Sequence, residues 1–237
     1  MNTTLITGAA GFIGFHLKNT LKHVGSVVGI DTLEESKIAS KNRALVHQDV
    51  IKASIHSKFI DELTEKPQVV VHLAAETGIS GSLSNPALYF HQNIEGTFNV
   101  LEACVKNNVK KLISSSSASV YGDATEVPMT ESHPFNNKNF YGATKIAGEA
   151  MCTAYNDRYG LEVIGLRYMN VYGAGQDQHA VYSGVVPIVL NKIEASVLPK
   201  KGNEFKVGYV GRWAKEKRPE LLPKIVVKKS NPSKLPR

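Results

Sequence analysis

The chain has 237 residues, of which 42% are hydrophobic and 21% are charged. This fits one sizeable globular domain with or without part of a second, and it excludes collagen-like, disordered and small disulfide-rich classes. The net charge of +7 is uneven, because residues 200–237 carry 12 Lys or Arg against 3 Glu, while residues 1–199 carry 16 basic and 18 acidic residues.

Cysteine use and hydropathy bear on the compartment. Cys104 and Cys152 fall in stretches that read as amphipathic helices, which predicts reduced, packed thiols rather than a disulfide framework. No run is long and apolar enough for a membrane span, and the first residues lack the pattern of a signal peptide. We therefore expect a cytoplasmic protein.

Short β-branched runs alternate with amphipathic helical stretches along most of the chain, which is typical of a parallel sheet between two helical layers. The sequence predicts an α/β fold with a doubly wound parallel sheet and helices on both faces. The expected strands are Thr4 to Thr7, Val27 to Asp31, Ala44 to His47, Val69 to His72, Lys111 to Ser115 and Glu162 to Arg167. The pattern weakens after Leu190, so we expect one domain over 1–199 and a basic tail over 200–237.

A glycine-rich loop follows the first expected strand. Gly8, Gly11 and Gly14 suit, in turn, a tight turn, the approach of a pyrophosphate to a helix N-terminus and close packing of that helix on the sheet. Asp31 ends the second strand 20 residues after Gly11, where a carboxylate can accept both hydroxyls of an adenosine ribose and disfavour a 2′-phosphate. The spacing predicts an NAD site; a strand-to-helix turn without a ligand is the alternative.

Other residues at the carboxyl ends of the expected strands would line the same crevice. For Asp49, a solvated turn explains the sequence almost as well. The cofactor-binding residues that we expect are Gly8, Gly11, Phe12, Ile13, Gly14, Asp31, Asp49, Val50, Ala74, Ala75, Tyr141 and Lys145.

A phenol and an ammonium lie four residues apart in Tyr141-Gly142-Ala143-Thr144-Lys145, so on a helix they share a face. One such pair is expected by chance, so the spacing alone is a weak signal. The pair gains weight because it follows a strand that runs into the hydroxyl cluster Ser114-Ser115-Ser116-Ser117-Ala118-Ser119-Val120-Tyr121-Gly122.

With these motifs in place, residues 1 to about 195 resemble the extended short-chain dehydrogenase/reductases, in particular the NAD-dependent nucleotide-sugar epimerases and dehydratases. The resemblance rests on the glycine loop, the Ser117 and Tyr141 segments, His72-Leu73-Ala74-Ala75, Asn93-Ile94-Glu95-Gly96-Thr97 and Arg167-Tyr168-Met169-Asn170-Val171-Tyr172-Gly173. It implies a Rossmann-type fold and NAD as the cofactor.

The resemblance also implies roles. Tyr141 would be the general base, Lys145 its electrostatic partner and a ligand of the nicotinamide ribose, and Ser117 the hydroxyl that binds the reacting sugar oxygen. An adjacent ammonium and an oxidised nicotinamide would favour the phenolate of Tyr141. Ser119 and Asn170 would also contact substrate, Asn170 through a diphosphate oxygen.

Epimerases and dehydratases share these parts, and the residues around Ser117 distinguish them. Dehydratases carry a Thr-Asp-Glu-like segment whose acids assist the loss of water. Here Ala118 and Ser119 stand in the two acidic places, and neither performs acid/base work near neutral pH. The sequence favours a 4-epimerase of a UDP-hexose, UDP-N-acetylhexosamine or UDP-hexuronic acid, with a transient 4-keto sugar.

Several assignments stay open. The segments Gln176-Asp177-Gln178 and Gly184-Val185-Val186-Pro187 resemble the part that meets the nucleotide base, but a polar loop and a short helix start explain them equally well. Asn93 supports active-site hydrogen bonds or is an ordinary helix-face amide. Family members commonly dimerise through helices that correspond to those around Asn93 and Tyr141, so we expect a homodimer. The histidine spacing predicts no metal site.

The family's carboxy-terminal lid segment is not recognisable after residue 199, so we expect a truncated or divergent, incomplete substrate-binding domain. Two other functions follow. One is an NAD-binding protein with little catalysis, because a 4-keto sugar must be shielded from water during turnover. If the protein is an enzyme, a dehydratase or decarboxylase of the same family is the alternative to an epimerase. The other is a nucleic-acid arm in the basic tail, which the scarcity of aromatic residues and the prolines at 199, 219, 223, 232 and 236 disfavour.

Overall fold

The structure is a computed structural model that describes residues 3–33, 50–61, 63–173, 176, 200–201, 204–206 and 226–228. The chain forms two compact units, Met1–Val171 and Tyr172–Arg237. Each unit is described by itself.

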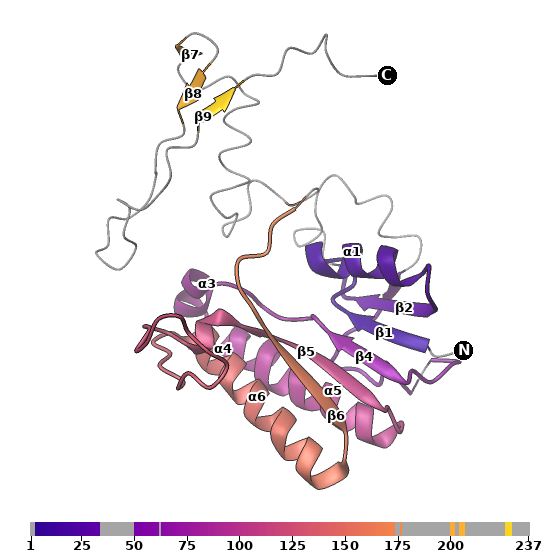
Figure 1. Ribbon diagram of the computed structural model, residues 1–237. Helices are drawn as coiled ribbons and strands as arrows, with labels where there is room; N and C mark the ends of the chain where they lie inside the picture. The colour runs from indigo at the N-terminus through magenta and orange to yellow at the C-terminus, as the bar shows by residue number, and fades with distance from the viewer. Residues whose placement is uncertain are drawn as a thin grey trace, which may run out of the picture. The chain divides into compact units, whose positions relative to one another are not determined.

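The first unit is built on a six-stranded sheet in the order β3-β2-β1-β4-β5-β6 (Figure 1). All neighbouring strands are parallel. The chain adds β2 and β3 on one side of β1 and β4, β5 and β6 on the other, as in doubly wound folds. The strands are β1 (Thr3–Thr7), β2 (Ser26–Asp31), β3 (Val50–Lys52), β4 (Val69–His72), β5 (Lys111–Ser117) and β6 (Glu162–Tyr168). The expected α/β fold class is confirmed.

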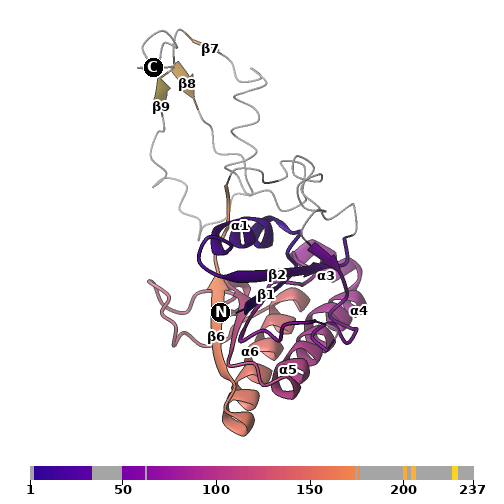
Figure 2. The same ribbon diagram turned by 90° about the vertical axis from the view of Figure 1, so that its right-hand side faces the viewer.

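Helices cover both faces of this sheet. Figure 2 shows α1 on one side of β1 and β2, with α5 and α6 on the other. The helices of the unit are α1 (Phe12–Leu21), α3 (Ile79–Ser84), α4 (Pro86–Tyr89), the π-helix η3 (Phe90–Glu95), α5 (Gly96–Lys106), the 3₁₀-helix η4 (Ala118–Val120) and α6 (Phe140–Tyr159).

Two hydrophobic cores correspond to these two layers. The larger one includes Leu5, Val70, Leu101, Leu112 and Cys152, between the sheet and α5 and α6. The smaller one includes Ile6, Ala9 and Val71, against which residues of α1 pack. Strands β1 and β4 are largely buried on both faces, so neither alternates apolar and polar residues; β4 begins with the apolar run Val69–Val71, and β1 is built from Leu5, Ile6 and three β-branched threonines.

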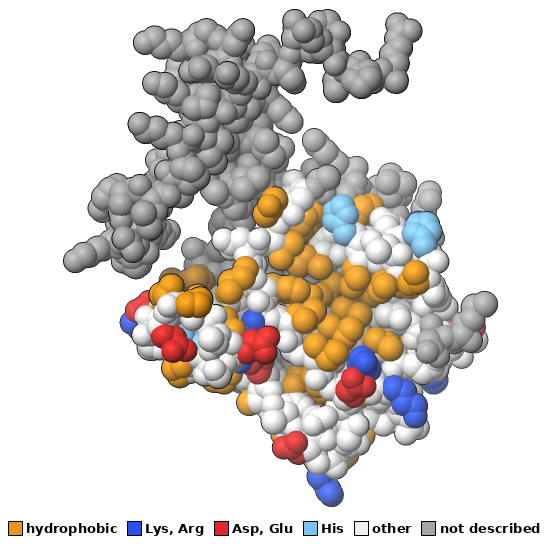
Figure 3. Space-filling view, in the orientation of Figure 1, with side chains coloured by type: hydrophobic (Ala, Val, Ile, Leu, Met, Phe, Trp, Pro, Cys, Tyr) orange, Lys and Arg blue, Asp and Glu red, His pale blue; other side chains and the backbone are white. Residues whose placement is uncertain are grey.

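The α1 side of the sheet is open over β6. Figure 3 shows hydrophobic side chains gathered on this face between α1 and β6. Ile164 and Leu166 are 40% and 38% exposed, whereas Val163, one residue before Ile164, packs against the larger core. The alternation identifies β6 as a strand with one covered and one open face among the described residues.

Five of the six expected strands are found within two residues of their predicted bounds. The expected strand at 44–47 lies outside the described residues, and the third described strand is Val50–Lys52. Val50 therefore lies within a strand rather than after one.

The second unit contains a small antiparallel sheet of β7 (Lys200–Lys201), β8 (Glu204–Lys206) and β9 (Val226–Lys228). The division that the sequence suggested at 199/200 stays a prediction. Among the residues placed by the structure, no helix is long and apolar enough to cross a membrane.

Candidate active site

The glycine-rich loop joins β1 to α1, and two of its glycines are required by close approach. Gly8 has φ +72°, and a Cβ there would lie 2.8 Å from the Ala74 nitrogen. A Cβ at Gly14 would lie 2.2 Å from the Gly8 carbonyl oxygen. A side chain at either position would push apart the loop, the start of α1 and the chain after β4.

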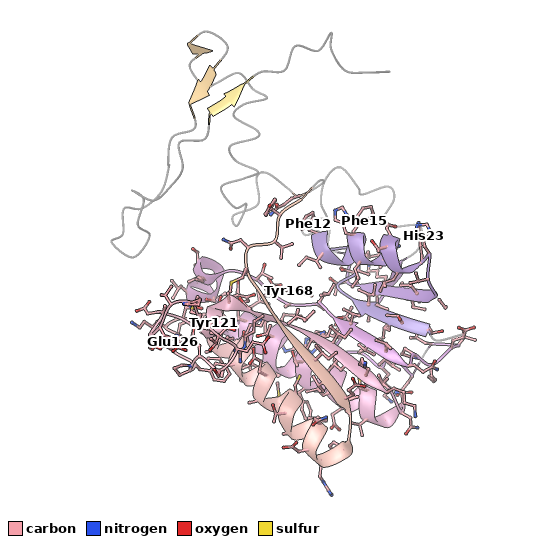
Figure 4. All side chains as sticks on the ribbon, viewed as in Figure 1. Phe12, Phe15, His23, Tyr121, Glu126 and Tyr168 are labelled. Atoms are coloured by element: carbon pink, nitrogen blue, oxygen red, sulfur yellow. The ribbon has the colours of Figure 1, made fainter. Side chains whose placement is uncertain are left out.

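The N-terminus of α1 is suited to an anion. Gly11 is its N-cap, no side chain caps its first N–H groups, and its first turn holds no acidic residue. Backbone N–H groups at a helix start, together with the helix dipole, favour a phosphate. Figure 4 shows Phe12 and Phe15 projecting from α1, and Phe15 packs against the smaller core.

Asp31, at the carboxyl end of β2, is bonded to the loop. Its Oδ2 accepts from the Ala10 N–H at 3.0 Å, and its Oδ1 accepts from the Leu33 N–H at 3.0 Å. A carboxylate has about four acceptor positions, so two hydrogen bonds leave capacity for ribose hydroxyls.

The remaining expected cofactor residues are placed in part. Asp49 lies outside the described residues. Val50 is buried in the smaller core with Ala9 and Ala10. The Ala74 N–H donates to Thr7 Oγ1 at 3.2 Å, and both Ala74 and Ala75 are half-buried. Ala74 and Ala75 follow β4, whose carboxyl end pairs with that of β1, at the edge where a doubly wound sheet binds its ligand.

The loop therefore fits a dinucleotide. An uncapped helix start that offers N–H groups, glycines that a Cβ would block and a carboxylate at the end of β2 supply the donors and acceptors that a pyrophosphate and a ribose require.

Tyr141 and Ser117 meet at the carboxyl end of β5. Tyr141 lies in the first turn of α6, where Asn139 caps the helix by accepting from the Gly142 N–H at 2.8 Å. The Ser117 hydroxyl lies near the phenol, where it acts to lower the pKa of Tyr141. Ser117 Oγ also accepts from the Ser119 N–H at 3.1 Å, so η4 fixes the serine that faces the phenol.

Lys145 lies one turn further along α6. Its Nζ lies 5.9 Å from the centre of the Tyr141 ring and donates to the Ser115 carbonyl oxygen at 2.9 Å. The ammonium thus has one fixed acceptor and two further N–H groups. The three residues that the sequence assigned to catalysis lie together.

Burial dominates the titration of this group. Burial raises the pKa of Tyr141 above its usual value, and the hydrogen bond with Ser117 opposes that rise. Burial lowers the pKa of Lys145 to about 8. The protein alone therefore holds Tyr141 as a neutral phenol near pH 7, and the lower phenol pKa that the sequence suggested requires the positive charge of an oxidised nicotinamide.

Asn93, in η3, is hydrogen-bonded to the first turns of α6. Its side chain is buried, and its Nδ2 donates to Thr144 Oγ1 at 3.0 Å and to the Glu76 carbonyl oxygen at 3.0 Å. Its Oδ1 accepts from the Glu76 N–H at 2.8 Å. Asn93 is therefore a hydrogen-bonded residue of the interior next to the Tyr141 turn rather than an ordinary helix-face amide.

An ion pair that the sequence did not predict joins Glu149 of α6 to Arg167 of β6. Glu149 accepts from Arg167 Nη2 at 2.8 Å and from Nε at 3.0 Å, and also from Ser116 Oγ. Arg167 lies over the rings of Tyr121 and Phe135, 4.9 Å and 5.1 Å from their centres. Figure 4 places Tyr121 among the loops beyond β5 and Tyr168 near the end of β6.

The two other expected substrate residues are less enclosed. Ser119 is half-buried, and Asn170 is exposed in the irregular segment after β6. Of the segments expected to meet the nucleotide base, only Gln176 is described, and 184–187 lies outside the described residues.

A cavity of about 760 Å³ lies between α6 and strands β5 and β6, and its walls include Lys145, Glu149 and Arg167. Neither Tyr141 nor the glycine-rich loop lines it, so it is a neighbour of the candidate site rather than the site itself. Within the described ranges, no group of three or more His, Cys, Asp or Glu is arranged to hold a metal ion.

Comparison with known proteins adds an independent finding. Residues 4–211 match the sequence profile of the NAD dependent epimerase/dehydratase family.

Individual relatives share the fold and about a third of the sequence. UDP-glucuronate 4-epimerase 3 of Arabidopsis thaliana is 37% identical over 185 residues, which is 72% of this chain and 43% of that protein. The UDP-N-acetylglucosamine 4-epimerase structure from Methanobrevibacter ruminantium is 31% identical with a TM-score of 0.74, over 86% of this chain and 67% of that one. The UDP-glucose 4-epimerase structure from Thermus thermophilus, a complex with NAD, is 29% identical with a TM-score of 0.71, over 86% and 69%.

Proposed function

Because the chain belongs to the NAD dependent epimerase/dehydratase family, whose cofactor is NAD, we propose that it interconverts two UDP-sugars by inverting C4 through a transient 4-keto sugar. The observation that carries this proposal is the meeting of Tyr141, Ser117 and Lys145 at the carboxyl end of β5, beside a loop that fits a dinucleotide.

Tyr141 takes the proton from the sugar 4-OH. The Ser117 hydroxyl lies near the phenol, where it acts to lower the pKa of Tyr141, so a sugar oxygen bound between the two hydroxyls lies within reach of the base. Ser117 orients that oxygen and donates to it as the carbonyl forms. When the carbonyl is reduced, Tyr141 returns the proton.

Acceptance and return of a hydride is the chemistry that NAD supplies when bound. The protein's part is to hold it: the α1 N–H groups would bind the pyrophosphate, Asp31 the adenosine ribose and Lys145 the nicotinamide ribose. Lys145 has two N–H groups beyond the one that Ser115 accepts, and its charge stabilises the Tyr141 phenolate.

Inversion rather than dehydration follows from the residues after Ser117. A dehydratase needs an acid and a base beside C5 and C6, whereas Ala118 and Ser119 form the start of η4 here. Ser119 is hydrogen-bonded to Ser117, and a hydroxyl is not ionised near neutral pH. Without these groups the 4-keto sugar has reduction at C4 as its exit.

The sugar is left as a class. The relatives compared above are named for UDP-glucuronate, UDP-N-acetylglucosamine and UDP-glucose, so identities near 30% support a UDP-sugar without choosing a hexose, an N-acetylhexosamine or a hexuronic acid.

We also propose a homodimer formed by the α5 and α6 layer. Phe90, Phe98 and Tyr159 are 51%, 46% and 54% exposed on this layer. Apolar rings that lie in water on adjacent helices favour association with a second copy.

A second candidate function is NAD binding with little turnover. The chain covers 67% and 69% of the two structures compared above and 43% of the Arabidopsis relative. Burial raises the pKa of Tyr141 above its usual value, and a neutral phenol is a poor base near pH 7.

Proton NMR of the purified protein with NAD and a panel of UDP-sugars separates the two. The epimerase predicts a new anomeric signal from the C4 epimer of one sugar, absent with the Tyr141→Phe variant. NAD binding without an epimer of any sugar in the panel would favour the second candidate.

A further inference from the structure

A continuous chain of hydrogen bonds links the end of β1 to the first turn of α6. His72, the last residue of β4, is 3% exposed. Its Nδ1 lies 2.8 Å from Thr7 Oγ1 and its Nε2 lies 3.1 Å from Thr97 Oγ1. Thr7 immediately precedes the glycine-rich loop, and Thr97 lies in the first turn of α5, so His72 joins the two.

The chain continues from Thr97 to the catalytic helix. Thr97 Oγ1 donates to the Asn93 carbonyl oxygen at 2.6 Å. The Asn93 side chain donates to Thr144 Oγ1 at 3.0 Å, and Thr144 Oγ1 donates to the Tyr141 carbonyl oxygen at 2.8 Å. Every hydroxyl in this chain of hydrogen bonds has a partner.

The directions of these bonds fix the tautomer of His72. A threonine hydroxyl has one hydrogen, and Thr97 gives its hydrogen to a carbonyl, which can only accept. Thr97 must therefore accept from His72, which requires a proton on Nε2.

The other end of the imidazole excludes a second proton. Thr7 Oγ1 already accepts the Ala74 N–H at 3.2 Å, and it accepts the Leu73 N–H, which is shared with the Thr7 carbonyl oxygen, at 3.2 Å. These bonds occupy both of its lone pairs, so its hydrogen is available to His72 Nδ1, which must accept.

Burial also favours the neutral form of His72 that the hydrogen-bond donors and acceptors require. Burial lowers the pKa of His72 to about 3, and the nearby positive charge of Lys145 also lowers it. The imidazole is neutral at any pH at which the protein would work.

We propose that neutral His72 is a positioning residue that holds the cofactor loop and the Tyr141 turn as one unit, an inference that rests on the function proposed above. The Thr7 hydroxyl ties the imidazole to the backbone beside Gly8, and Thr97 and Asn93 tie it to α6. Placement of the nicotinamide end of a cofactor relative to Tyr141 then depends on both bonds of one side chain, and small misplacements of reacting groups cost much of the rate.

The tautomer can be read in the unmodified protein. Two-bond ¹H–¹⁵N correlation spectra of histidine-labelled protein distinguish the two neutral forms and the charged form. We expect the His72 signals of the Nε2–H form, unchanged between about pH 5 and pH 9. An Nδ1–H form, or titration of His72 within that range, would overturn the proposal, and this experiment needs no variant that folds.

Thr97→Val and Thr97→Ser form a matched pair. Valine keeps the shape of threonine but leaves the His72 Nε2–H without an acceptor, whereas serine keeps the hydroxyl. With an epimerised sugar, we expect kcat of Thr97→Val to fall roughly 10- to 100-fold, with KM and the Kd for NAD within about twofold. Thr97→Ser should recover most of kcat. A folded Thr97→Val protein with unchanged kcat would show a merely structural role.

A third readout separates this inference from the proposed function. If the unmodified protein binds NAD but epimerises no sugar, the proposed function fails. Hydrogen exchange of the α6 amides then tests the proposed link through His72 separately. We expect NAD to slow exchange around Tyr141 in the unmodified protein and in Thr97→Ser, and not in Thr97→Val. Equal slowing in all three would overturn the link.

Discussion

The Asp31 carboxylate accepts a hydrogen bond from the Ala10 N–H at 3.0 Å, so the residue at the end of β2 fixes the loop that follows β1. One side chain thereby shapes the glycine-rich loop and keeps further acceptor positions, which we propose for a ribose. These two tasks give Asp31 a larger effect on cofactor binding than a ribose contact alone.

Asp31→Ala should weaken NAD binding roughly 10- to 100-fold, because hydrogen bonds to a charged group contribute about 1.5–3 kcal/mol. Asp31→Asn keeps one acceptor oxygen and should lose less. Isothermal titration with NAD measures both, and an unchanged Kd in the alanine variant would show that the ribose lies elsewhere.

Tyr141→Phe should lower turnover about 10²- to 10⁴-fold, the usual contribution of a general base, with the NAD affinity retained. Tyr159→Phe is the matched control, since Tyr159 ends the same helix and is 54% exposed. Coupled assays on both variants test the role of Tyr141 as the general base. Full activity of Tyr141→Phe would exclude that role.

NAD affinity should fall as the pH rises above about 8. Burial lowers the pKa of Lys145 to about 8, so the ammonium that would hold the nicotinamide ribose is present below that pH and is lost above it. Binding measured at about pH 7 and pH 9 should therefore differ, and Lys145→Met should remove the difference. The same affinity at both pH values in the unmodified protein would contradict this role.

Glu149→Gln should lower the free energy of unfolding by about 2 kcal/mol, because it leaves a half-buried guanidinium without its ion-pair partner. Glu162→Gln breaks an exposed pair with Lys111 and should cost less than about 1 kcal/mol. Urea unfolding compares them, and equal losses would mean that the Glu149 pair acts as a surface pair.

The same ion pair has a predicted acid dependence. Burial raises the pKa of Glu149, but the hydrogen bonds from Arg167 and Ser116 outweigh it and hold the pKa below the usual value. The stabilisation is therefore present above the unfolded-state pKa near 4.5 and is lost as the pH falls below it. The difference in the free energy of unfolding between the unmodified protein and Glu149→Gln should therefore shrink as the pH falls below about 4.5.

Phe98→Asp should produce a monomer, since it places a charge on the layer proposed to meet a second copy. Val24→Asp is the control, because Val24 is 81% exposed and follows α1. Analytical ultracentrifugation measures the mass of each. A dimer that persists in Phe98→Asp would move the interface elsewhere.

The sequence was most informative where residues are buried on both sides of the sheet. Strands β1 and β4 have no solvent-exposed face, so β4 stands out by the apolar run Val69–Val71, and β1 by its β-branched residues around Leu5. The third strand has three residues with only Val50 buried, and such a short segment carries no clear period.

Within the candidate site, the sequence predicted the arrangements of residues that are close along the chain and missed the contacts between residues that are far apart. Tyr141 and Lys145 share a helix face, and the glycine spacing is local. The pair of Glu149 with Arg167 depends on how α6 crosses β6, and the bonds of His72 join residues 65 and 25 positions away. No local pattern announces such contacts.

The measurement that tests the central claim most directly uses the epimerised UDP-sugar carrying deuterium at C4. Hydride removal and return at one carbon predicts that the label stays on C4 of the epimer, with no loss to water. Deuterium at C6 would identify a dehydratase, and deuterium released into solvent would contradict transfer through the cofactor.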